Sequence, residues 1–180
     1  MKNIIILDKD SPAIVYLCKK DKRLAKIISI IGPISYSPHT NPYPFLIHEI
    51  IEQMLSVEAG AKIYGRLQKL CHGNISIDSV ISLSDQQIKS IGTSTAKVSY
   101  IRNLTTAIKD DVLDFSKLKE LSDEEAIEQL ISIRGIGSWS AKMFLIFALN
   151  RQDILPYEDV AFLQSFQWLY KTNSRSKEIV

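Results

Sequence analysis

Cysteine is scarce in this sequence, and the cysteines that occur are far apart. Cys18 and Cys71 are the only two among 180 residues, and their separation does not match the short ligand spacings of zinc sites or iron–sulfur clusters. Two distant cysteines also do not form the disulfide framework of a small secreted protein. The sequence therefore predicts neither a cysteine-bound metal centre nor a fold that depends on disulfides.

Long hydrophobic runs and a strong net charge are also absent. The longest apolar run, MFLIFAL at residues 143–149, is too short to cross a membrane. The N-terminus, MKNIIILDKD, shows no signal-peptide cleavage pattern, so we expect a cytoplasmic protein without a membrane partner. The formal net charge is only +2, so any basic surface for nucleic acid must be local.

The composition that is present is that of an ordinary globular domain. Hydrophobic residues make up 46% of the chain and charged residues 23%, which is typical of a protein with a packed core. A length of 180 residues suits one domain, or two lobes that share one core. Strand-like alternation is weak and confined to NIIIL at residues 3–7.

Helix start signals and apolar stripes predict an all-α fold for the rest of the chain. Ser11 and Pro12 mark the start of a first helix, and Asp21 caps a second one that ends at a Gly-Pro pair. Segment 34–44, rich in proline and polar residues, predicts a connecting loop. Further helices are predicted at residues 45–55, 57–70, 82–92, 93–111, 121–133, 138–150 and 159–170.

Capping boxes and glycines add detail to these helices. Ser84 pairs with Gln87, and Ser122 with Glu125, in the pattern that marks a helix N-terminus. The helix at 57–70 contains two glycines, Gly60 and Gly65. Because glycine lowers helix propensity, we interpret both as places where another helix packs closely.

A tight turn with two glycines joins the helices at 121–133 and 138–150. Glycine accepts positive φ and lets another backbone approach closely. The first peptide N–H groups of a helix have no acceptor within the helix and stand at the positive end of its dipole, so the start of the second helix favours a phosphate oxygen. The alternative is an ordinary helix turn that needs glycine for its shape. The candidate phosphate-binding residues are Arg134, Gly135, Gly137, Ser138 and Ser140.

The turn and the residues after it resemble a known family. The segment LISIRGIGSWSAKMFLIFALNRQDILPYEDVAF resembles the hairpin and Gly/Pro/Asp segment of the helix-hairpin-helix DNA glycosylase superfamily, in particular the 3-methyladenine DNA glycosylase II family. The segments DKRLAKIISIIGP, PYPFLIHEIIEQMLSVEAGAKIYGRL and TAKVSYIRNL resemble further blocks of that family in the same order. The resemblance covers most of residues 12–165.

The resemblance implies an all-α, two-lobed glycosylase fold with a DNA-binding cleft between the lobes. It implies one domain over residues 1–180, with an N-terminal segment at 1–44, the helix-hairpin-helix motif at about 123–150 and a catalytic aspartate loop at 151–160. The implied partner is double-stranded DNA with a damaged base. The implied protein is a monomer that requires no cofactor, and it is associated with the nucleoid if it is bacterial.

An aspartate after the proline is catalytic in this family, and Asp159 is the residue that matches. Cleavage of an N-glycosidic bond builds positive charge on the sugar, which a fixed carboxylate stabilises while it orients or deprotonates the attacking water. Asp159 also stands at a predicted helix start, where the dipole favours an ionised carboxylate. The alternative is an ordinary N-cap aspartate. We interpret the adjacent Glu158 as a solvated neighbour.

The resemblance also assigns a base pocket. Related glycosylases that nick the strand carry a lysine nucleophile at the position of Trp139, and an indole cannot form a Schiff base, so we expect a monofunctional enzyme. The family places an aromatic ring there against the alkylated base, and Met143 lines the same pocket. A core tryptophan that packs the hairpin is the alternative. We interpret Lys142 as solvated or facing a phosphate.

Two further roles follow from the resemblance. Met54 matches an apolar family residue that wedges into the duplex, and Gln53 would then face the orphaned base; a core methionine is the alternative. The family hairpin also binds a monovalent cation, Na or K, through main-chain carbonyls. In this chain those carbonyls belong to Ile131, Ile133 and Ile136.

In the resembling family the chain continues beyond the helix that follows the aspartate, whereas this sequence ends at NSRSKEIV, so the resemblance leads us to expect a C-terminally shortened fold. The predicted function is a monofunctional DNA glycosylase that hydrolyses the N-glycosidic bond of alkylated purines, of the 3-methyladenine type, in base excision repair. Two alternatives stay open. One is a non-catalytic helix-hairpin-helix DNA-binding protein, and the other is a glycosylase for uracil or mismatched bases.

Overall fold

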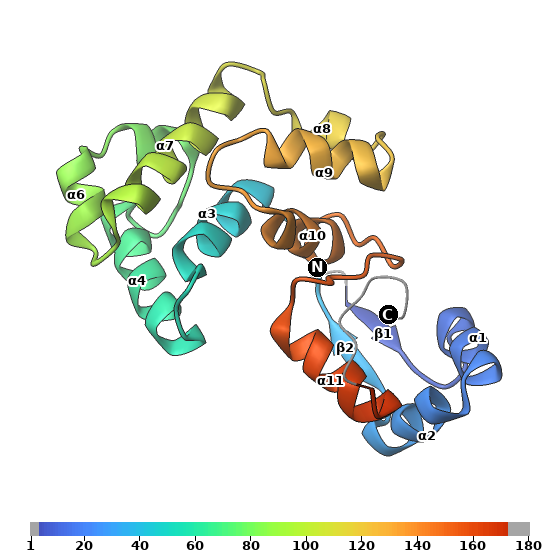
Figure 1. Cartoon of the computed structure of the whole chain (residues 1–180). Coiled ribbons are helices and arrows are strands. Elements are labelled where there is room, and N and C mark those ends of the chain that lie inside the picture. The colour runs from blue at the N-terminus through green and yellow to red at the C-terminus, as the bar shows by residue number, and fades with distance from the viewer. Residues whose placement is uncertain (1–3, 173–180) are drawn as a thin grey trace. The chain divides into compact units, whose positions relative to one another are not determined.

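The computed structural model describes residues 4–172 and divides the chain into two compact units (Figure 1). The terminal unit combines Met1–Pro38 with Leu155–Val180, and the central unit is His39–Ile154. The C-terminal segment NSRSKEIV, residues 173–180, lies outside the described residues. No helix among residues 4–172 has both the length and the apolar character needed to cross a membrane.

The terminal unit is helical but contains one small sheet. Its elements are β1 (Ile5–Leu7), α1 (Pro12–Lys20), α2 (Lys22–Ile31), β2 (Ile34–Tyr36) and α11 (Val160–Tyr170). The two strands pair antiparallel, with Ile5 opposite Tyr36 and Leu7 opposite Ile34. The loop that we expected at residues 34–44 is therefore wrong at both ends: its first residues pair with the segment that gave the weak strand signal near the N-terminus, and residues 42–44 belong to a helix. The mostly helical fold class is confirmed.

Asp21 connects α2 to α11. One carboxylate oxygen accepts the N–H groups of Arg23 and Leu24, so Asp21 caps α2 as predicted. The other carboxylate oxygen accepts a hydrogen bond from the hydroxyl of Tyr170, at an oxygen–oxygen distance of 2.6 Å. These hydrogen bonds lower the pKa of Asp21. Burial and the Asp21 carboxylate raise the pKa of Tyr170 to about 12. A local cap therefore also holds together segments from the two ends of the chain.

The hydrophobic core belongs entirely to the central unit. Its helices are α3 (Pro42–Glu52), α4 (Val57–Leu70), α5 (Ile77–Ile81), α6 (Asp85–Ser90), α7 (Thr95–Lys109), α8 (Phe115–Leu118), α9 (Asp123–Ile131) and α10 (Ser138–Phe147). All the buried hydrophobic side chains among residues 4–172 lie in this unit, whereas none of the described side chains of the terminal unit is fully buried. The core thus forms the base on which α9 and α10 are held.

Most helix starts in the central unit follow the sequence signals. The capping boxes of Ser84 with Gln87 and of Ser122 with Glu125 are both formed. Gly60 is buried, and a Cβ there would lie 2.6 Å from Cγ of Glu52, so the prediction of close packing is confirmed at Gly60. It is wrong at Gly65, where a Cβ would meet nothing within 4 Å. The short helices α5 and α8 were not predicted.

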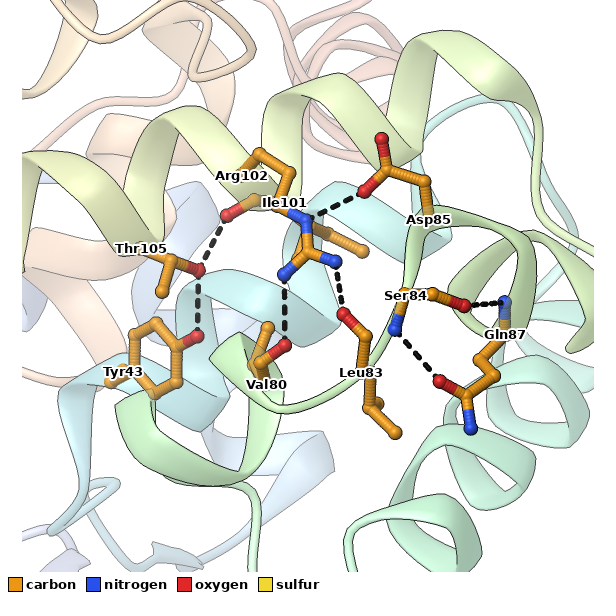
Figure 2. A network of polar contacts seen from close by, with 9 residues as sticks. All are labelled: Tyr43, Val80, Leu83, Ser84, Asp85, Gln87, Ile101, Arg102 and Thr105. Carbon is orange, nitrogen blue, oxygen red and sulfur yellow. Dashed lines mark hydrogen bonds and ion pairs between the residues drawn. The ribbon is translucent and has the colours of Figure 1, made fainter.

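Arg102 on α7 fastens the α5–α6 segment (Figure 2). Its guanidinium donates to the carbonyl oxygens of Val80 and Leu83 and forms an ion pair with Asp85. On the same helix, Thr105 donates to the carbonyl of Ile101 and shares a 2.8 Å hydrogen bond with the hydroxyl of Tyr43. Side chains of α7 thus satisfy buried polar groups from several neighbouring segments.

Candidate functional site

The glycine turn between α9 and α10 has the predicted form of a helix hairpin. The two helices pack against each other, and the linking residues 132–137 contain Gly135 with φ of +114°. A Cβ at Gly135 would lie 2.4 Å from Cβ of Tyr100 on α7. Both the backbone conformation and this close approach require glycine at this position.

The second glycine serves a different purpose from the first. Gly137 is the N-cap of α10, with φ of −92° and ψ of 172°, a conformation open to any residue. It is exposed, and a Cβ there would meet nothing within 4 Å. The protein's own structure therefore does not require glycine here. The lack of a side chain leaves the first N–H groups of α10 approachable from outside, which suits an anion at a helix N-terminus.

Side chains from other helices hold the main chain of the hairpin. The amide of Asn103 on α7 donates to the carbonyl of Arg134 at 3.0 Å. The amide of Gln53, just after α3, donates to the carbonyl of Gly135 at 2.9 Å. The turn is therefore fixed through its carbonyl groups.

The candidate phosphate-binding side chains differ in exposure. Arg134 is exposed and Ser138 is half-buried. Ser140 is only 2% exposed, and its hydroxyl lies 3.4 Å from the amide nitrogen of Gln53. The hydroxyl of Ser140 is therefore buried beside Gln53, and its predicted phosphate contact stays a prediction.

The turn after α3 presents the predicted wedge residue. The helix ends at Glu52 rather than at Leu55, so the expectation that Met54 continues the helix is wrong. Met54 adopts φ of 59°, and its side chain is fully exposed. The alternative that Met54 is a core methionine is therefore also wrong. An apolar side chain held out into solvent on a strained turn suits insertion into a binding partner.

Lys97 on α7 closes this turn. Its ammonium donates to the carbonyl oxygen of Ile51 at 2.7 Å and to that of Gln53 at 2.6 Å. Both carbonyls belong to the C-terminal end of α3, where the helix leaves acceptors unpaired and the dipole favours a cation. Burial lowers the pKa of Lys97. No signal local to Lys97 in the sequence predicted this contact, because it joins segments 44 residues apart.

The residues assigned to the base pocket lie on α10. Met143 and Lys142 are each 8% exposed, and Met143 belongs to the core cluster. Trp139 is half-buried and packs against the same cluster. Trp139 thus packs against the core, as expected from the alternative in which it is a core tryptophan. Its predicted role in stacking on the base stays a prediction. The burial of Lys142 contradicts our interpretation of it as a solvated side chain.

Asp159 occupies the start of α11. Its carboxylate accepts the N–H of Phe162 at 2.7 Å, so the predicted N-cap is confirmed. Glu158 beside it is exposed. Asp159 belongs to the terminal unit and the hairpin to the central unit. Its predicted place at a cleft and its catalytic role therefore stay predictions.

Candidate cation ligands occur in two places. The carbonyl of Ile133, one of the three proposed for a monovalent ion, accepts the N–H of Ile136 at 3.0 Å. Among residues 4–172, the metal-ligating side chains of His48, Glu49 and Glu52 cluster with ligand atoms within 4.8 Å of one another. However, Nδ1 of His48 faces Glu49 at 3.9 Å, while Nε2 faces Glu52 at 3.4 Å. This is the arrangement of an imidazole between two carboxylates rather than of ligands around one ion.

Residues 47–180 match the model of the HhH-GPD superfamily of base excision DNA repair proteins. The chain is 30% identical over 153 residues to DNA-3-methyladenine glycosylase 1 of Schizosaccharomyces pombe, and the alignment covers 83% of this chain and 67% of that protein.

Solved structures also resemble this chain over most of its length, and two of them serve as examples. A DNA-3-methyladenine glycosidase from Bacillus halodurans is 34% identical, with a TM-score of 0.85 over 92% of this chain and 77% of that chain. The 3-methyladenine DNA glycosylase of Schizosaccharomyces pombe in complex with abasic DNA is 25% identical, with a TM-score of 0.80 over 91% of this chain and 82% of that chain.

Proposed function

Because this chain belongs to the HhH-GPD superfamily of base excision DNA repair proteins, we propose that it is a monofunctional DNA glycosylase for alkylated purines. The hairpin between α9 and α10 carries the proposal. Gly135 must be glycine because a Cβ there would collide with Tyr100. Gly137 has no side chain to cover the start of α10, so that helix end can be approached from outside. The similarity to 3-methyladenine glycosylases, including one bound to abasic DNA, supports alkylated bases in duplex DNA as the substrate.

The proposed DNA contacts fall on two segments of the central unit. The N–H groups at the start of α10 bind a backbone phosphate, and the exposed Arg134 adds a charge to the same contact. Met54 enters the base stack from its exposed turn and fills the gap that the flipped nucleotide leaves. Phosphate binding sets the position of the duplex, while the wedge lowers the cost of taking the base out of the stack.

The proposed chemistry centres on Asp159. Loss of an alkylated purine leaves a sugar with oxocarbenium character, and a carboxylate beside it stabilises that charge and orients the attacking water. The N–H of Phe162 holds one oxygen of Asp159, which fixes the orientation of the carboxylate. Trp139 stacks on the electron-poor alkylated ring. An indole forms no Schiff base, so the product is an abasic site in an intact strand.

The remaining parts of the proposal concern the state of the protein. We propose a two-lobed monomer in the cytoplasm, on the nucleoid if the cell is bacterial, that needs no redox or organic cofactor. A sodium or potassium ion at the carbonyls of Ile131, Ile133 and Ile136 would give the hairpin a positive charge near the phosphate.

The experiment is single-turnover release of methylated purines from alkylated duplex DNA, scored as free base and abasic sites. We expect base release by the parent and a loss of a hundredfold or more, about 3 kcal/mol, for Asp159→Asn. Glu158→Gln is the matched control, since its exposed side chain is adjacent, and it should keep the parent rate. Equal rates for Asp159→Asn and the parent would refute the role of Asp159. Tight DNA binding without base release by the parent would favour the binding-only alternative.

A further inference from the structure

Three residues on α7 together contact the two segments proposed to bind DNA, namely the turn that carries Met54 and the hairpin between α9 and α10. Lys97, Tyr100 and Asn103 are spaced three apart, so they lie along one side of the helix. Lys97 contacts the end of α3. Tyr100 lies against Gly135, and Asn103 donates to the carbonyl of Arg134. The wedge turn and the hairpin, 82 residues apart in sequence at Gln53 and Gly135, are therefore held by one rigid element.

Gln53 completes the connection between the two segments. Its main-chain carbonyl accepts the Lys97 ammonium, and its side-chain amide donates to the carbonyl of Gly135. Lys97 therefore holds the residue that bridges to the hairpin. A change in the position of Lys97 moves the backbone of Gln53 and, with it, the exposed side chain of Met54 next in the chain.

We propose that Lys97 is a positioning residue that sets the distance and orientation between the Met54 wedge and the phosphate-binding hairpin. This inference rests on the proposed function. The Met54 wedge can enter the base stack only if it is correctly placed while the hairpin binds its phosphate. A displacement of about 1 Å between groups that must act together can lower the rate up to a hundredfold. Lys97 acts through Met54 and touches neither the base nor the sugar.

The same geometry predicts that Lys97→Met lowers stability, because two carbonyls at the end of α3 lose their donor, but that α7 itself stays in place. The core face of α7 is formed by Val98, Ile101 and Leu104, all buried, and Lys97 is not part of it. Arg102 and Thr105 independently join α7 to its neighbours. Loss of the ammonium therefore frees the end of α3 while α7 stays packed in place.

The test compares Lys97→Met with Lys109→Met, a change of an exposed lysine at the last turn of the same helix. Methionine keeps the length of the side chain and removes the donor. Base flipping is followed by 2-aminopurine fluorescence beside the lesion, which needs no catalysis. Affinity for undamaged duplex is measured at fixed salt, and base release under single turnover.

We expect Lys97→Met to keep its affinity for undamaged duplex within about twofold, because the phosphate contact is intact. The flipping signal and the rate of base release should fall together, roughly tenfold to a hundredfold. Lys97→Arg should restore part of both, since a guanidinium can donate to two carbonyls. Lys109→Met should behave as the parent.

Two results with the Lys97→Met variant would overturn the proposal. One is parent-like flipping by Lys97→Met. The other is an equal loss of undamaged-duplex affinity and of flipping, which would make Lys97 merely structural. If the parent releases no base but flips it, the proposed function fails while the 2-aminopurine signal still decides the role of Lys97. A parent that does not flip the base at all overturns both.

Discussion

The side-chain amide of Gln53 donates a 2.9 Å hydrogen bond to the main-chain oxygen of Gly135. This contact joins the turn that presents Met54 to the hairpin that begins α10. The amide nitrogen of Gln53 also lies 3.4 Å from the hydroxyl of Ser140. In this structure the amide of Gln53 therefore belongs to the framework of the hairpin, and its predicted contact with an orphaned base requires that framework to rearrange.

Gly135→Ala should disrupt the hairpin. A Cβ at this position would lie 2.4 Å from Tyr100, and the φ of +114° is unfavourable for any residue with a side chain. We expect the free energy of unfolding, measured by urea denaturation, to fall by at least about 2 kcal/mol. Gly137→Ala is the matched control, since its Cβ meets nothing within 4 Å. A stable Gly135→Ala variant with parent-like unfolding would contradict the steric account.

Gly137→Leu tests the phosphate contact separately from stability. Position 137 is exposed and sterically open within the protein, so the fold should tolerate a bulky side chain. That side chain would cover the first N–H groups of α10 and weaken binding to all duplex sequences alike, because phosphate contacts carry no sequence information. Affinities at one fixed salt concentration on several duplexes provide the measurement. Unchanged affinity would exclude a phosphate at the start of α10.

Strand cleavage should be absent. In the family resemblance, Trp139 matches the position at which strand-nicking glycosylases carry a lysine, and an indole cannot attack the sugar to form an imine. We expect abasic duplex to accumulate, and strand breaks to appear only after treatment with alkali. Borohydride treatment during the reaction should trap no covalent adduct. A trapped adduct that disappears in Lys142→Gln would show that the neighbouring Lys142 acts as a nucleophile.

The helix starts were predictable because their signals are local. Ser84 with Gln87 and Ser122 with Glu125 satisfy N–H groups within one turn, so the sequence alone contains both partners. The start of α5 was not predicted, because its capping box pairs Ser76 with Ser79 and lacks the usual glutamate or glutamine. Its short length of five residues also leaves too few positions for a periodic apolar pattern.

The end of α3 was not predictable in the same way. Apolar spacing continues through Met54 and Leu55, yet the helix ends at Glu52. The carbonyls at that end are satisfied by Lys97, a partner more than forty residues away in sequence. The candidate site depends on such contacts, since Tyr100 and Asn103 also act at long range. The sequence predicted the hairpin glycines and the helix start at Asp159, but not the side chains that hold the hairpin.

Arg102→Met should destabilise the central unit. The change leaves the carbonyls of Val80 and Leu83 without their donor (Figure 2). Two unsatisfied, partly buried acceptors cost roughly 2 to 4 kcal/mol in the free energy of unfolding. Asp85→Ala removes only the ion pair, whose carboxylate side chain is 74% exposed, so we expect less than about 1 kcal/mol from it. Equal losses in the two variants would show that the ion pair dominates.

His48 should make stability depend on pH. The nearby carboxylate of Glu49 raises the pKa of His48, and the carboxylate of Glu52 raises it further. Together they outweigh the opposing effect of burial. One oxygen of Glu49 is buried without a hydrogen-bond partner, so a nearby positive charge is valuable. Because the folded-state pKa lies above the ordinary value of about 6.5, the stabilisation is complete below that value. It is lost as the pH rises through the folded-state pKa.

His48→Gln should therefore lower the melting temperature more at about pH 6 than at about pH 9, where His48 is neutral in both states. His72→Asn is the control, since His72 is exposed and asparagine tolerates its φ of 53°. NMR titration should show His48 losing its proton above the ordinary value of about 6.5. The ring centroids of His48 and Tyr64 lie 4.6 Å apart. If His48→Gln lowers the melting temperature equally at both pH values, the imidazole stabilises α3 by packing against Tyr64 and not by its charge between the carboxylates.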